Sequence, residues 1–431
     1  GPLLAGSLSV VNLGITRPGA NKAKKDHVPS PLYMEPFHME GPMGADDLLN
    51  LRKFLAPEIV FGTGALKLAG QHATNLGATK VLVVTDAGVQ GAGWTAKVEE
   101  SLVEMGLPFI TYDRVTPNPK DHEVMAGAEL YEQEACDLIM AVGGGSPMDC
   151  AKGIGVVAGN QGHIVQFEGI DEVNSPGPPF IFVPTTAGSA AEVSQFAIIT
   201  DTARHLKIAI ISKMVMPDIA LVDPQTTITM SPSLTAATGM DALCHAFEAF
   251  VSNAASPLTD MAALNAAQLI AENLQGAYRS PNDMHHRGNM MMASMMAGLA
   301  FSSASLGLVH AMAHSLGGWR GLAHGECNAV LLEQVVRYNY RSASEKYDRL
   351  ARAMGIEIDD VDPRRRAARI ADHLACLRAE LGITQRLGEM GVDRSDIARL
   401  AASAASDPCM ATNPCSASVA DIAAIYTDIY Q

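Results

Sequence analysis

Three features are scarce in this sequence of 431 residues: long apolar runs, paired cysteines and excess positive charge. No apolar run reaches the roughly 18 residues that a membrane-spanning helix needs, and the methionine-rich stretch Met290–Met296 is too short. The net charge of −15 at pH 7 opposes binding to nucleic acid, which is itself a polyanion. We therefore expect a globular protein with neither a membrane nor a nucleic acid as partner.

The seven cysteines give no sign of a disulfide framework, because they are scattered and odd in number. A cytoplasmic location is expected, since disulfides persist mainly in oxidising compartments and the N-terminus lacks the pattern of a signal peptide. Residues 1–45 show neither helical nor strand periodicity, and Gly1–Pro2 resembles the remnant of a protease site. We interpret 1–45 as a flexible segment and base no fold prediction on it.

Short apolar runs alternate with helical stretches over residues 46–225, which indicates an α/β domain with a mostly parallel sheet. Runs of four or five apolar residues bounded by Gly, Asp or Pro are typical of buried strands. The expected strands are Val81–Val84, Phe109–Thr111, Leu138–Val142, Phe180–Val183, Ile208–Ile211 and Ile219–Val222.

The composition changes after Asp223–Pro224 to long stretches rich in Ala, Leu and Met. Ser231–Pro232 supplies a helix cap followed by a first-turn proline. We therefore predict a second, all-helical domain over residues 226–431. Its basic run Pro363–Arg366 is interpreted as the solvated start of a helix rather than as a binding patch.

A glycine-rich loop follows the expected strand Leu138–Val142 and runs through Gly143–Asp149 into a helix. Glycines let a backbone approach a diphosphate, and a helix N-terminus offers unpaired N–H groups and a positive dipole end. The sequence thus predicts a nucleotide site, although a tight turn without a ligand would give the same pattern. The letters Gly153-x-Gly155-x-x-Ala158 also match a dinucleotide fingerprint, but they start inside the helix, so we attribute these glycines to close helix packing.

Two other loops follow expected strands. Asp86 comes after Val81–Val84, where a carboxylate could bind an adenosine ribose and repel a 2′-phosphate, which would favour NAD over NADP. The alternative role for Asp86 is a helix cap. The loop Pro184–Ser189 places small hydroxyl residues after Phe180–Val183, and open α/β sheets bind ligands along this edge.

Histidine and aspartate recur at helical spacing in the second half of the chain. Asp241 and His245 lie four residues apart, and His310 and His314 repeat that spacing. His324 follows a glycine-rich turn expected over residues 317–321. Mixed nitrogen and oxygen ligands suit Fe²⁺ or Zn²⁺ better than Ca²⁺ or Mg²⁺. A single histidine on such a helix is usually a hydrogen-bonded core residue, but the combination favours a metal site.

With these signals in hand, the chain resembles the iron-containing (group III) alcohol dehydrogenase family over nearly all of its length after residue 50. The resemblance implies a nucleotide-binding α/β domain and an all-α metal-binding domain, the fold also found in dehydroquinate synthase, with cofactor and metal in the cleft between them. The matching stretches are Gly143–Lys152, Pro184–Glu192, Ala237–Glu248, Gly307–Gly318 and His324–Asn328.

The resemblance also implies roles for individual residues. A metal ion, Fe²⁺ with Zn²⁺ as the alternative, would be held by Asp241, His245, His310 and His324. His314 becomes a candidate for proton relay near the nicotinamide. The implied NAD contacts are Asp86, Asn118, Gly144, Gly145, Ser146, Asp149, Thr185, Thr186 and Lys207. The chain departs from the family's pattern at Glu333–Gln334 and Asn413–Cys415, and none of these residues is an implied ligand.

The implied reaction is NAD(H)-linked hydride transfer to or from a small alcohol or aldehyde, in a homo-oligomer of two or more subunits. Two alternatives stay open: a lyase resembling dehydroquinate synthase, which uses NAD and a metal without net redox, and an NAD-binding scaffold without turnover. Arg320 adds a hypothesis about the substrate. Inside the cleft it would favour an anionic aldehyde, because Arg pairs with carboxylates bidentately, whereas at the surface it would be solvated or pair with an acid.

Overall fold

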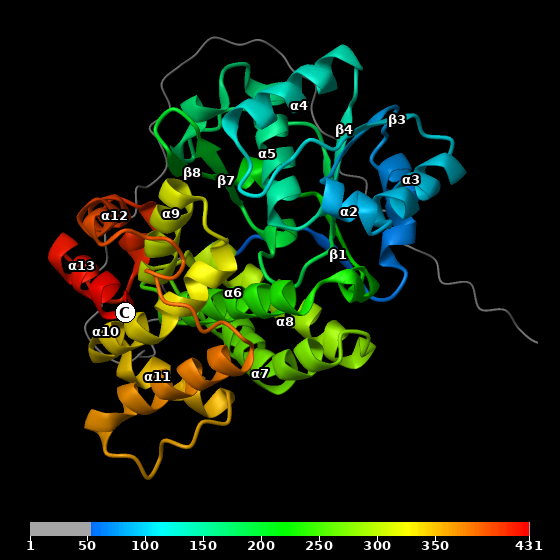
Figure 1. Cartoon of the computed structure of the whole chain (residues 1–431). Coiled ribbons are helices and arrows are strands. Elements are labelled where there is room, and N and C mark those ends of the chain that lie inside the picture. The colour runs from blue at the N-terminus through cyan, green and yellow to red at the C-terminus, as the bar shows by residue number, and fades with distance from the viewer. Residues whose placement is uncertain (1–52, 431) are drawn as a thin grey trace, which may run out of the picture. The chain divides into compact units, whose positions relative to one another are not determined.

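The computed structural model describes residues 53–430, so the flexible segment predicted for 1–45 lies outside the described residues. All strands of the described chain lie between Glu58 and Val222, and only helices and loops follow (Figure 1). This confirms the predicted fold class, an α/β half with a mostly parallel sheet followed by a helical half. The domain limits 46–225 and 226–431 stay a prediction.

A six-stranded parallel sheet forms the centre of the first half. Its strands lie in the order β1 (Glu58–Phe61), β9 (Ile219–Val222), β6 (Phe180–Pro184), β4 (Leu138–Gly143), β2 (Val81–Val84) and β3 (Phe109–Tyr112). Val81 of β2 lies opposite Phe109 on one side and Leu138 on the other. Because both faces of a parallel sheet are covered, its strands can be apolar throughout, and β2 and β4 are buried at every position.

Alternate side chains of the strands enter two separate cores. Val81 and Val83 pack with η2 (Ala65–Leu68), α1 (Ala69–Asn75) and α3 (Trp94–Glu104). A short helix, α2 (Ala87–Gly91), comes just before α3 in the chain. Leu82 and Val84 belong to the core on the opposite face, with α4 (Asp121–Gln133) and α5 (Gly145–Asn160). The period of two in a strand thus produces a doubly wound sheet.

The prediction for Ile208–Ile211 was wrong in one respect, because this strand lies outside the parallel sheet. It is part of β8 (Leu206–Ile211), which pairs antiparallel with β7 (Phe196–Asp201) and parallel with the two-residue strand β5 (Gly169–Ile170). Only four residues join β7 to β8, too few for the crossover that a parallel pair needs. The Asp201 carboxylate closes this turn by accepting N–H bonds from Ala203 and Arg204.

The second half packs its helices around one large apolar core. Ser231 caps its first helix as predicted, because its hydroxyl oxygen accepts the N–H of Leu234 at 3.1 Å. The helices are α6 (Pro232–Val251), α7 (Pro257–Arg279), α8 (Met284–Ala304), α9 (Leu308–Arg320), α10 (His324–Ala353), α11 (Pro363–Glu380), α12 (Ile397–Ala405) and α13 (Val419–Asp428). The basic run does begin helix α11, as expected.

Within residues 53–430, no single helix is long and apolar enough to cross a membrane. Only α8 and α9 taken together would be long and apolar enough, and they are bent by 99° relative to each other. Both helices are largely buried in the helical core.

The turn expected over residues 317–321 was also wrong, since α9 continues to Arg320 and ends at Gly321 with a φ of 66°. Its glycines serve close packing instead. A Cβ on Gly318 would lie 3.0 Å from the Cα of Leu206, and one on Gly317 would lie 3.0 Å from Cε of Lys207. The glycines therefore let α9 lie directly against β8.

Candidate active site

The strand order places the predicted nucleotide loops where ligands of such sheets bind. After β2 the chain forms edge strand β3 and then returns to form β4 on the other side of β2. The carboxyl ends of β2 and β4 therefore flank a topological switch point, at which a crevice opens. Asp86 follows β2, and the loop Gly144–Ser146 follows β4.

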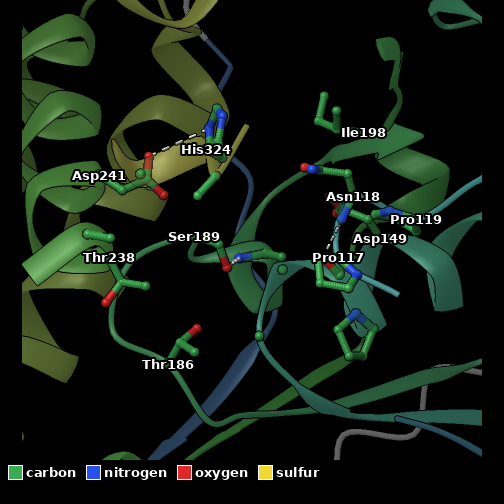
Figure 2. A pocket seen from close by; sticks show the side chains of 18 of the residues that line it. Pro117, Asn118, Pro119, Asp149, Thr186, Ser189, Ile198, Thr238, Asp241 and His324 are labelled. Atoms are coloured by element: carbon green, nitrogen blue, oxygen red, sulfur yellow. Dashed lines mark hydrogen bonds and ion pairs between the residues drawn. The ribbon is translucent and has the colours of Figure 1, made fainter. Parts of the chain in front are cut away.

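One cavity of about 870 Å³ extends from this switch point to the helical half, and every site residue predicted from the sequence lines it. Figure 2 shows Asp241 and His324 at one wall of this cavity and Asn118 and Asp149 at the other. The predicted residues thus share one cavity, and their assignment as site residues stays a prediction. Their roles are a separate question.

The diphosphate end of the cavity is built by the first turn of α5. Gly144 precedes the helix in extended conformation, and the loop Thr185–Ser189 approaches so closely that a Cβ on Gly145 would lie 3.1 Å from the Cβ of Ser189. The N–H of Asn118 donates to the Ser146 hydroxyl at 3.2 Å, which ties the segment after β3 to the same turn. This gives a helix N-terminus surrounded by small and hydroxyl side chains, which suits an anion.

Asp86 does cap a helix, since its Oδ1 accepts the N–H of Val89 at 2.9 Å, and it also lines the cavity. Burial raises the pKa of Asp149 to about 6, against the attraction of Lys152. Burial also lowers the pKa of Lys207. Lys152 itself lies outside the cavity lining and donates to the carbonyl oxygens of Ser194 and Phe196.

The second glycine pattern has the packing role that we expected. A Cβ on Gly155 would lie 2.2 Å from the ring of Phe180, and one on Gly153 would lie 2.9 Å from Val124. Both glycines lie in the middle of α5 and neither lines the cavity.

Four predicted ligands meet at the other end of the cavity. Asp241 and His245 lie on one face of α6, His310 lies on α9, and His324 is the first residue of α10. The Nε2 atoms of His245, His310 and His324 lie 3.8, 3.6 and 3.6 Å from Oδ1 of Asp241. Tetrahedral ligands at about 2.1 Å from one ion are about 3.4 Å apart, so these spacings fit a single metal.

Neighbouring groups hold the imidazoles in place. Glu248, one further turn along α6, lies 2.6 Å from Nδ1 of His310, and the carbonyl oxygen of Gly188 lies 3.1 Å from Nδ1 of His245. These acceptors leave the Nε2 atoms of both rings facing Asp241, as metal-ligating histidines require. The side-chain nitrogen Nδ2 of Asn328 lies 2.6 Å from Oδ1 of Asp241, 3.1 Å from Nε2 of His310 and 3.2 Å from Nε2 of His324.

The electrostatics of the cluster favour a bound cation. Burial opposes the charged form of each group, yet the three imidazoles hold the pKa of Asp241 far below its usual range. Burial lowers the pKa of His245 to about 4, whereas hydrogen bonds to Asp241 and Glu248 overcome burial and raise that of His310 to about 9. Within residues 53–430, the ion pairs of Asp241 and Glu248 are with imidazoles alone. A divalent ion would neutralise them, so the residues present fit a metal.

His314 lies beside this cluster, with its ring stacked on that of His324 at 5.5 Å between centroids. Its Nδ1 lies 2.9 Å from Oδ2 of Asp407, a residue that comes just before the 3₁₀ helix η8 (Pro408–Thr412). The carboxylate orients the ring, so that His314 faces the cavity as a group able to exchange a proton.

Of the two positions considered for Arg320, the structure shows the one at the surface, paired with an acid. Its guanidinium pairs with Asp396, and it does not line the cavity. The structure therefore gives no support to an anionic substrate bound through Arg320.

Three residues that hold the site were missed in the sequence. Glu248 follows Asp241 and His245 on the same helical face, at seven residues from the first, and Asn328 follows His324 by four, so helical spacing alone could have indicated both. Asp407 had no such signal, because it contacts His314 only through packing of the chain.

Comparison with known proteins agrees with this architecture. The profile described as iron-containing alcohol dehydrogenase matches residues 56–224, and the one described as Fe-containing alcohol dehydrogenase family, C-terminal, matches residues 235–430. A curated relative, the 1,3-propanediol dehydrogenase of Citrobacter freundii, is 41% identical over 381 residues, covering 88% of this chain and 98% of that protein. The NAD-dependent methanol dehydrogenase of Bacillus methanolicus is 38% identical over 372 residues, covering 86% and 98%.

Among solved structures, a 1,3-propanediol oxidoreductase superposes with a TM-score of 0.86 at 40% identity, covering 88% of this chain and all of that one. The fold and cavity define a two-part oxidoreductase that combines a nucleotide site with a metal site. The chain belongs to the iron-containing alcohol dehydrogenase family.

Proposed function

We propose that this chain is an iron-dependent, NAD(H)-linked alcohol dehydrogenase that oxidises small alcohols and reduces the corresponding aldehydes. The observation that carries the proposal is a single cavity in which a helix N-terminus suited to a diphosphate faces a cluster of buried Asp241, His245 and His310 with the half-buried His324. Membership of the family supports iron, and the NAD-dependent methanol dehydrogenase among the relatives supports NAD.

Asp241, His245, His310 and His324 would hold the ion, with Zn²⁺ as the alternative occupant. When bound, the ion would act as a Lewis acid on the substrate oxygen, and the nicotinamide would exchange the hydride. The chain would position the substrate against apolar walls, which include Phe301, Leu306 and Cys409, and these would exclude water.

The nucleotide would lie along the sheet side of the cavity. Gly144, Gly145 and Ser146 would bind its diphosphate at the N-terminus of α5, with Thr185 and Thr186 across from them. Asp86 would accept hydrogen bonds from the adenosine ribose and disfavour a 2′-phosphate. The remaining contacts would come from Asn118, Asp149 and Lys207.

His314 would take the proton that an alcohol releases on oxidation and return it on reduction. Asp407 would keep its Nδ1 engaged, so that the other ring nitrogen faces the cavity. Among the described side chains that line the cavity, His314 is the imidazole that belongs to neither the four-residue cluster nor the nucleotide loops.

The test is an anaerobic preparation loaded with Fe²⁺ and assayed for NADH formation with a panel of short alcohols. Substitution His245→Ala is expected to abolish iron retention and turnover together while NAD affinity stays nearly unchanged. The exposed His285 on α8 gives a control, since His285→Ala should change neither. Turnover by a metal-free His245→Ala protein would contradict the metal assignment.

The same assay separates the alternatives. Stoichiometric NADH formation excludes a lyase without net redox, and NAD binding without turnover on any alcohol or aldehyde would favour a scaffold. The predicted homo-oligomer and the predicted cytoplasmic location stay expectations, and light scattering in solution would test the first of them.

A further inference from the structure

A second group of metal-ligating side chains lies next to the first. His314 on α9, Asp407 and Cys409 each offer a ligand atom, and these atoms lie within 4.8 Å of one another. The three are already linked, because Nδ1 of His314 lies 2.9 Å from Oδ2 of Asp407 and the Cys409 thiol donates to the same carboxylate. None of them belongs to the four-residue cluster.

The group is held rigidly. Oδ1 of Asp407 accepts the N–H of Cys409 at 2.8 Å and so caps η8, which fixes both residues relative to each other. The ring of His314 is stacked on His324. Tetrahedral nitrogen, oxygen and sulfur ligands of one zinc ion are about 3.3–3.6 Å apart. The 2.9 Å between Nδ1 of His314 and Oδ2 of Asp407 would therefore widen by a few tenths of an ångström on ion binding.

The group is also accessible from two sides. Cys409 and His314 line the main cavity, whereas His314 and Asp407 line a second cavity of about 620 Å³. An ion could therefore enter through the second cavity even when a nucleotide occupies the first. Three protein ligands would leave a fourth position for water.

We propose that His314, Asp407 and Cys409 form a second site, for a divalent transition-metal ion of the zinc or cobalt class. A thiolate, a carboxylate and an imidazole suit such borderline ions, whereas Ca²⁺ and Mg²⁺ prefer oxygen ligands alone. The two anionic ligands would neutralise the ion in a buried place. On binding, the Cys409 S–H proton passes to solvent, and His314 binds the ion through Nδ1 as the neutral imidazole that carries its proton on Nε2. Occupancy would engage His314 and therefore inhibit turnover, a consequence that rests on the proposed function.

Cobalt gives a test that does not depend on activity, because a thiolate bound to Co²⁺ produces a near-ultraviolet charge-transfer band and the four-residue cluster has no sulfur. The full chain, dialysed anaerobically against Co²⁺, is expected to bind two ions and to show the band. Cys409→Ser should bind one ion without the band, and its retained first ion shows that it folds. His245→Ala should lose the first ion and keep the band. Cys376, an exposed thiol, gives the control, since Cys376→Ser should keep both.

One cobalt per wild-type chain without a charge-transfer band would overturn the second site, and so would a band that survives Cys409→Ser. Neither result touches the proposed dehydrogenase activity. Conversely, failure of NADH formation with a normal cobalt band would reject the proposed function and leave the second site in place.

Discussion

Glu248 is the residue whose replacement most directly tests how the metal ligands are held. Its Oε2 lies 2.6 Å from Nδ1 of His310, and its Oε1 accepts the N–H of Val309 at 2.6 Å, so one buried carboxylate both fixes the imidazole and caps α9. In Glu248→Gln the side-chain amide keeps one acceptor oxygen, whereas the carboxylate faces three donors: the N–H groups of Val309 and His310 and Nδ1 of His310. Either the N–H of Val309 loses its partner, or Nδ1 of His310 becomes an acceptor and its Nε2 carries the proton.

An Nε2 that carries a proton cannot bind a metal. Loss of such an outer hydrogen bond typically weakens metal affinity by about 10–100-fold, which corresponds to about 1.4–2.7 kcal/mol. We expect Glu248→Gln to show this loss in anaerobic competition with a chelator, using Zn²⁺ or Co²⁺, while NAD affinity is unchanged. Glu333, a carboxylate of α10 paired with Arg378, gives the control, since Glu333→Gln should bind metal as the wild type does. Wild-type metal affinity in a folded Glu248→Gln protein would refute the assigned role.

Three further predictions follow from the nucleotide end and from the start of the helical half. Asp86→Asn keeps a good cap but removes the charge, so the ratio of kcat/KM for NAD to that for NADP should fall, and an unchanged ratio would count against the ribose contact. Gly145→Val should weaken NAD binding by about 1–3 kcal/mol in calorimetry through overpacking against Ser189, with metal content unaltered. Ser231→Ala removes the acceptor for the N–H of Leu234 and should lower the free energy of unfolding by about 1 kcal/mol in urea titration, with normal kinetics at low temperature.

Local signals were sufficient for the elements that carry the site. A buried parallel strand is apolar at every position, so β2, β4, β6 and β9 could be found from short runs alone. The loops after such strands meet at one edge of the sheet, and therefore Asp86 and Gly144 could be placed near each other without coordinates. Residues four apart on a helix share a face, which identified Asp241 with His245 and His310 with His314.

Contacts between distant segments could not be found in this way. The bond between His310 and Glu248 spans 62 residues, and that between His314 and Asp407 spans 93. Each depends on how α9 packs against α6 and η8, which no local pattern specifies. The same reason explains the error at β8, because an apolar run shows that a strand is buried but not which sheet it joins. Phe196–Asp201 was missed as its partner, and the short turn between them gave the only signal.

The loop Pro184–Ser189 links the two ends of the cavity. Ser189 and Thr186 lie against Gly145 and Gly144 at the N-terminus of α5, while the carbonyl oxygen of Gly188 holds His245. Gly188 itself packs closely against α6, since a Cβ there would lie 2.6 Å from the carbonyl oxygen of Thr238. A nucleotide that shifts this loop would therefore also shift the imidazole of His245. Because energetic coupling between two sites is reciprocal, metal binding should raise NAD affinity by the same factor by which NAD raises metal affinity. Calorimetric titration of each ligand with and without the other measures both factors, and factors of one in both titrations would exclude this coupling.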